Sequence, residues 1–124
     1  MLFPTVLSGQ GKVIINEVMA SCHKANVDEY GEHDDWLELR SLSSDHVDIA
    51  GMFFLVDHEL WEIPQGRPDL TRIPPNGYTV IWFDGQDHQG ALHAPFNLPR
   101  SGAAILLVDV NGSSLLDAFT YSKQ

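Results

Sequence analysis

The sequence has a single cysteine, Cys22, and no hydrophobic run that approaches the ~20 residues needed for a membrane-spanning helix. One cysteine excludes an intrachain disulfide and a zinc site built from cysteines. The N-terminal stretch MLFPTVLSG lacks a basic residue and contains Pro4, so it does not have the form of a signal peptide. If the natural protein has a signal sequence, we expect it outside this chain.

Basic residues are also scarce: seven Lys and Arg stand against seventeen Asp and Glu, a formal net charge of −10. Affinity for nucleic acid comes largely from Lys and Arg that displace counterions, so this balance argues against nucleic-acid binding. It argues equally against docking on anionic membranes. Cations and basic protein surfaces are the partners that the charge favours.

Helical spacing of apolar residues is missing as well, and we expect little or no helix. The apolar residues fall in short runs between turn residues, which is typical of an all-β domain. The 124 residues fit one domain, and seven strands with turns between them favour two sheets packed face to face. The predicted strands cover residues 12–18, 36–41, 52–56, 60–63, 78–83, 103–109 and 114–121.

Two local patterns refine this expectation. Alternation at 36–41 puts Leu37 and Leu39 on one face of their strand, and we expect both to point inward with Ile105 and Leu107. Asn111-Gly112, between two apolar runs, predicts a tight hairpin in which both central residues adopt positive φ. The polar residues 84–95, in contrast, should form a loop.

Several segments together resemble the lamin tail domain, in particular its bacterial branch. They are VIINEVMAS, DDWLELRSLSSDHVDIAGMFF, WEIP, IPPNGYTVIWFDG, LHAPFNL and SGAAILLVDVNGSSLLDAFTY. The resemblance implies an immunoglobulin-like β-sandwich over residues 12–124, preceded by an N-terminal extension at 1–11. It also implies a domain without enzymatic activity, carried by a larger exported or cell-surface bacterial protein. The chain lacks the coiled-coil rod and basic surface of the nuclear members, which argues against nuclear and DNA-binding roles.

The acidic loop at residues 28–38 contains six acids and no Lys or Arg. Carboxylate oxygens are the ligands that Ca²⁺ prefers, and Gly31 permits a sharp turn. The predicted ligands are Asp28, Asp34 and Asp35, with Glu17 from a neighbouring strand as a fourth. The EF-hand pattern is incomplete here, and the alternative is a solvated acidic face.

Asp84, Asp87 and His93 form a second candidate cation site. The plainer interpretation is an Asp-Gly turn and a histidine that is hydrogen-bonded to loop backbone. Similarly, Trp36, Trp61 and Trp82 could form a stacking platform for sugars, although tryptophans in such strands more often belong to the core or cover a sheet face.

No nucleophile–base pair, phosphate-binding loop or G-x-S-x-G elbow is readable in the sequence. We therefore expect a non-catalytic interaction module that docks proteins or neighbouring domains of its own chain, outside the cell or at its surface. The alternative is a Ca²⁺-dependent adhesion or carbohydrate-binding module that uses the loop 28–38 and binds polysaccharide.

Overall fold

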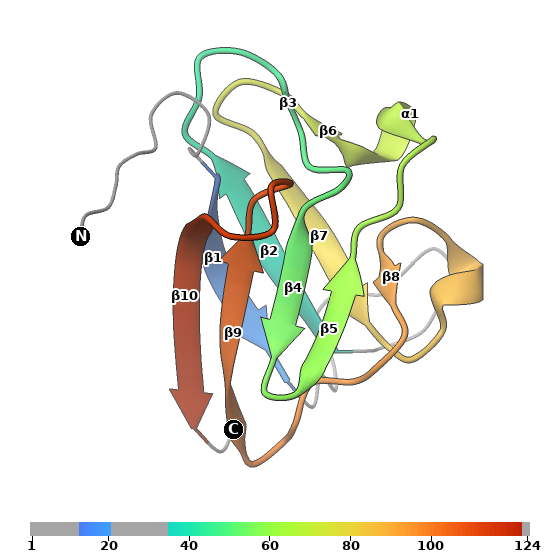
Figure 1. The fold of residues 1–124 in the computed structure, drawn as a ribbon, viewed down its shortest axis with the longest axis vertical. Helices are drawn as coiled ribbons and strands as arrows, with labels where there is room; N and C mark the ends of the chain where they lie inside the picture. Colours follow the sequence, from blue (N-terminus) through green and yellow to red (C-terminus); the bar gives the residue numbers. More distant parts are fainter. Residues whose placement is uncertain (1–12, 21–34, 123–124) are drawn as a thin grey trace.

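The computed structural model describes residues 13–20 and 35–122, and the regular secondary structure of these residues is almost entirely β-strand (Figure 1). The prediction of an all-β domain is therefore confirmed. The only helices in this part of the chain are a single α-helical turn and one 3-10 turn, and neither could span a membrane. The elements are β1 (Val13–Met19), β2 (Asp35–Ser41), β3 (Val47–Asp48), β4 (Phe53–Val56), β5 (Glu59–Glu62), α1 (Pro68–Thr71), β6 (Arg72–Ile73), β7 (Tyr78–Phe83), η1 (Asp87–Gln89), β8 (His93–Ala94), β9 (Gly102–Val108) and β10 (Leu115–Ser122).

Two four-stranded sheets form the two layers of the fold. One has the order β1-β2-β7-β8 and the other β10-β9-β4-β5. All neighbours are antiparallel except β7 and β8. In Figure 1 the sheet β10-β9-β4-β5 lies in front of β1, β2 and β7, and the short pair β3-β6 lies at the upper end.

The core lies between the two sheets and is built by alternation along the strands. Leu37 and Leu39 of β2 and Ile105 and Leu107 of β9 are all fully buried, so the prediction that they point inward is confirmed. Burying one such side chain stabilises the fold by about 1.5–3 kcal/mol. Aromatic rings also join the layers: Phe54 of β4 meets the edge of Phe83 of β7, with ring centroids 5.4 Å apart.

A β-bulge interrupts β1 between Ile15 and Glu17, and another interrupts β10 between Leu115 and Asp117. The backbone N–H of Ile15 donates a 2.7 Å hydrogen bond to Oδ2 of Asp117. Bulges re-aim a strand and break its regular ladder. Here the hydrogen bond lies at the two bulges and joins β1 to β10, which are edge strands of the two sheets. The Ile15 N–H is therefore paired, whereas at an open edge it would be exposed.

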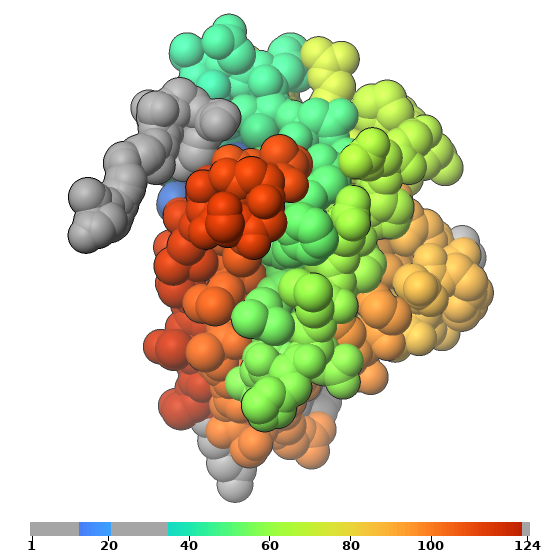
Figure 2. Space-filling model, in the orientation of Figure 1, coloured from blue at the N-terminus to red at the C-terminus, as the bar shows by residue number. Residues whose placement is uncertain are grey.

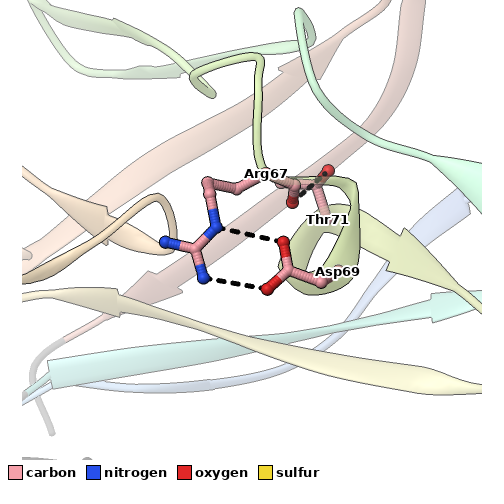
Figure 3. A network of polar contacts seen from close by, with 3 residues as sticks. All are labelled: Arg67, Asp69 and Thr71. Atoms are coloured by element: carbon pink, nitrogen blue, oxygen red, sulfur yellow. Dashed lines mark hydrogen bonds and ion pairs between the residues drawn. The ribbon is translucent and has the colours of Figure 1, made fainter.

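The turn α1 begins with Pro68, whose fixed φ suits the first helical position. Figure 3 shows the polar contacts around it: Nε and Nη2 of Arg67 donate to the two carboxylate oxygens of Asp69, at 3.0 and 2.8 Å. This hydrogen-bonded guanidinium lowers the pKa of Asp69. The hydroxyl of the buried Thr71 lies near the carbonyl oxygen of Arg67 and donates to Oδ1 of Asp48 at 2.7 Å, joining this turn to β3.

Two sequence predictions about loops need correction. Residues 84–95 are not simply a loop, because they contain η1 and the two-residue strand β8, which pairs with β7. The hairpin prediction is right in place but wrong in detail, because Gly112 has positive φ (+77°) whereas Asn111 does not. The reason is a longer connection, closed by a hydrogen bond from Asp109 N–H to the Ser114 carbonyl. In it the Asn111 side chain accepts hydrogen bonds from the N–H groups of Ser113 and Ser114, both at 2.9 Å.

Candidate functional site

The predicted calcium ligands are only partly covered by the structure, because Asp28 and Asp34 lie outside the described residues. Glu17 is exposed and lies opposite Glu38 of β2. Asp35 precedes Glu38 by three positions. In a strand this spacing places their Cα atoms about 10 Å apart and their side chains on opposite faces. The structure therefore does not bring Glu17 and Asp35 together. No group of three or more His, Cys, Asp or Glu side chains in the described part of the chain could hold a metal.

Asp35 instead helps to hold the segment between β8 and β9. Its Oδ2 accepts a 3.1 Å hydrogen bond from the N–H of Leu98. The next residue, Pro99, accepts a 2.5 Å hydrogen bond from the hydroxyl of Tyr121 on the other sheet. Burial, and then the negative charges of Asp35 and Asp57, raise the pKa of Tyr121 to about 12. Both layers therefore hold this segment.

The structure brings together two of the three residues of the second candidate cation site, Asp84 and His93. Nδ1 of His93 lies 2.6 Å from Oδ2 of Asp84, and both side chains are buried. Oδ1 of Asp84 accepts the N–H of Gln86 at 3.0 Å, and Gly85 has the positive φ of a tight turn (+73°). Asp87 is exposed in η1 and takes no part in this pair.

The Asp84–His93 pair fastens β8 to the end of β7. The imidazole of His93 stacks on Trp82, with ring centroids 6.5 Å apart and planes inclined by 19°. Only 1% of the His93 side chain is exposed. The Asp-Gly turn of the plainer interpretation is present. The imidazole of His93 contacts the Asp84 carboxylate, and the backbone N–H of His93 donates to the carbonyl oxygen of Gly90 in the loop.

The tryptophans do not form an exposed platform. Trp61 belongs to the main core between the sheets, where it stacks on Phe54. Trp36 and Trp82 lie opposite each other on β2 and β7, in a second small cluster, and both are buried. The expectation that these residues belong to the core or cover a sheet face is confirmed.

A feature that the sequence did not single out is the solvent side of the sheet β10-β9-β4-β5. Because Phe54, Val56, Ile105 and Leu107 point inward, their neighbours along the strands point outward. Strand register aligns these neighbours in two rows across the sheet. We call this surface the outer face; it consists of Phe53, Leu55, Leu60, Leu106, Val108, Leu115 and Ala118.

The outer face is open in the space-filling view, where β4, β5 and β9 lie at the front of the molecule (Figure 2). Leu60 is 63% exposed and Leu115 is 55% exposed. A shallow groove of about 340 Å³ is lined by Phe53, Leu55, Leu60, Val108 and Gly112. Groups of exposed large apolar side chains are uncommon on soluble proteins, and such a surface usually marks an interaction site.

Three acidic residues of the described chain lie at the border of the outer face. Asp57 directly follows β4, Glu62 lies opposite Phe53, and Asp109 begins the hairpin after β9. Neither 53–62 nor 102–122 contains a Lys or Arg. A further depression of about 370 Å³ beside the hairpin adds more acids, because it is lined by Asp45, His46, Asp48 and Asp109, with Ser43, Val47, Met52 and Val110.

Comparison with known proteins adds no family or function to this picture. No protein-family model matches the chain, and no curated protein matches it significantly. The candidate site therefore rests on the geometry of the outer face and on the chemistry of its border.

Proposed function

We propose that this domain is a non-catalytic interaction module with a lamin-tail-like, immunoglobulin-like fold, and that it docks a protein or a neighbouring domain through the outer face. In this proposal the domain belongs to a larger exported or cell-surface bacterial protein. The exposure of large apolar side chains on the outer face is the observation that carries it. Water leaves such side chains when a partner covers them, and this is the main driving force for association.

The layered arrangement supports the immunoglobulin-like part of the proposal. In both sheets, strands distant in sequence are neighbours: β2 pairs with β7, and β4 pairs with β9. Such long connections between antiparallel neighbours are a feature of Greek-key sandwiches. The sequence resemblance to bacterial lamin tail domains points to the same fold.

The non-catalytic part is supported by the buried position of Asp84 and His93, the one close carboxylate–imidazole pair among the described residues. A general base must reach the proton that it abstracts, and this pair is closed off from solvent. We expect the isolated domain to give only background rates in assays of phosphate-ester, peptide and glycoside hydrolysis. A reproducible activity that is lost on substitution of Asp84 would contradict this assignment.

Cysteine footprinting of the full-length protein tests docking. Cys22 is replaced by serine, and a single cysteine is placed at Leu60 or, as a matched control, at Leu42, an exposed leucine outside the outer face. We expect maleimide to label Leu60→Cys more slowly in the full-length protein in its host than in the isolated domain, with no such difference for Leu42→Cys. Equal labelling of Leu60→Cys in both settings would contradict docking through this face.

A further inference from the structure

We infer that the outer face binds a basic amphipathic polypeptide segment, one that presents apolar side chains to the groove and Lys or Arg to the acidic border. This inference rests on the proposed function and specifies the partner. Three observations carry it: the shape of the groove, the charge around it, and the position of the basic residues of the domain.

The groove suits a few large apolar side chains. Its volume of about 340 Å³ lies at the low end of the range of about 300–1,000 Å³ for small-ligand sites. The outer face continues past the groove over all four strands. Strands about 4.8 Å apart make the sheet about 14 Å wide, and three turns of helix, about 16 Å, would cross it.

The border requires positive charge on the partner. Asp57 and Glu62 are exposed and carry no ion pair within the described part of the chain. Asp109 stands at the hairpin, next to the depression that also contains Asp45 and Asp48. Lys or Arg side chains placed beside the apolar centre of a partner would meet these carboxylates, while apolar side chains cover the leucines.

The described basic residues of the domain are not part of the outer face. Arg67 is paired with Asp69 beside α1, and Arg40 lies over the ring of Tyr78 on the other sheet, 5.3 Å from its centroid. Arg72 belongs to β6, and Arg100 lies in the segment before β9. No Lys or Arg occurs in the strands or connecting turns that carry the outer face.

The same charges disfavour two other occupants. A two-fold dimer would place the outer face of one copy on that of the other, so the acids of both borders would approach each other. Each copy also carries a net charge of −10. An anionic membrane would be repelled by the same border, because attraction to such surfaces comes from Lys and Arg.

Binding of designed peptides to the intact domain tests the inference. The first peptide is an amphipathic helix of about 14 residues with leucines on one face and lysines on the other, long enough to cross the sheet. The second has glutamate in place of lysine, and the third has lysines with serine in place of leucine. Fluorescence anisotropy of labelled peptides gives Kd. We expect binding of the Leu/Lys peptide alone, weakened by added salt.

Substitutions then locate the binding. The double variant Leu60→Ser/Leu115→Ser should raise Kd at least tenfold, as truncation of central apolar contacts does. Glu62→Gln should raise it about threefold at low salt, in line with an exposed ion pair. Leu42→Ser, the matched control, should leave Kd unchanged, and circular dichroism of each variant checks that the fold is retained.

Four results would overturn the inference: equal binding of the Leu/Glu peptide, equal binding of the Lys/Ser peptide, equal loss in Leu42→Ser, or no binding at all. Dimers in sedimentation that dissociate on Leu60→Ser would assign the face to a second copy. Binding to phosphatidylserine vesicles but not to the peptide would assign it to a membrane. If Leu60→Cys is protected in the full-length protein and the Leu/Lys peptide still does not bind, the chemistry inferred for the partner is wrong while docking stands. If Leu60→Cys is not protected, docking itself fails.

Discussion

Replacing Asp84 by alanine removes two hydrogen-bond acceptors from the end of β7. Oδ2 no longer faces Nδ1 of the buried His93, and Oδ1 no longer accepts the N–H of Gln86. Leaving a buried imidazole nitrogen without its partner costs about 1–3 kcal/mol, and losing the second bond costs about 0.5–1.5 kcal/mol. We expect Asp84→Ala to lower the free energy of unfolding by about 1.5–4.5 kcal/mol, the sum of these terms. For a domain of this size the melting temperature should fall by roughly 6–18 °C.

Urea denaturation of the isolated domain, followed by tryptophan fluorescence, measures this loss. Asp87→Ala is the matched control, because Asp87 lies in the same loop but is exposed, and it should change stability by less than about 0.5 kcal/mol. In a double-mutant cycle with His93→Ala, the two substitutions should couple by about 0.5–3 kcal/mol because the side chains touch. Equal stability of Asp84→Ala and Asp87→Ala would refute the role of the pair as a structural tie.

Three further outcomes are expected. Leu37→Ala should cost about 2–5 kcal/mol in urea denaturation, since Leu37 is fully buried, whereas Leu60→Ser should cost less than about 0.5 kcal/mol; similar costs would contradict the assignment of inner and outer faces. Tyr121 has a pKa raised to about 12, above the ordinary value of about 10, so its contribution to stability is fully present below pH 10 and is lost as the pH rises through 12. Tyr121→Phe should flatten the fall of stability in this window, and an unchanged profile would contradict the burial of its hydroxyl. The sequence prediction of a Ca²⁺ site in the acidic loop is tested by the melting curve: if the site exists, a hundredfold excess of Ca²⁺ over Kd adds about 2.7 kcal/mol, and the resulting rise in melting temperature should vanish in Asp34→Asn/Asp35→Asn and persist in Asp45→Asn/Asp48→Asn. An unmoved melting curve would leave a solvated acidic face.

Much of the fold could be predicted from the sequence because its main strands carry local patterns. The alternation at Leu37 and Leu39 identifies an inner face without knowledge of any neighbour. Strands β3, β6 and β8 could not be found this way, because two residues are too short to show a period. They exist only because distant segments pair with them: Val47 lies opposite Ile73, and His93 lies beside Trp82.

The candidate site was harder to predict for a related reason. Residues 53–56 and 103–108 are apolar on both faces of their strands, which is the usual signature of strands covered on both sides. Whether the second face is covered depends on the other layers of the fold, which no local pattern reveals. Once Phe54 and Leu107 are known to point inward, Phe53, Leu106 and Val108 must point outward, and the run of apolar residues becomes the signal for an exposed surface. The sequence indicates Asp84 and His93 as candidates, but only the pairing of β7 with β8 shows that they meet in the interior.

Site-specific photo-crosslinking in the host cell tests the central claim most directly. A photoreactive amino acid is placed at Leu60 or Leu115 on the outer face, or at Leu42 as the control, in the full-length protein. Docking through the outer face predicts one discrete crosslinked product shared by positions 60 and 115 and absent at 42, with the crosslink mapping to an apolar segment flanked by Lys or Arg. Crosslinks that form equally at all three positions, or at none, would contradict the account.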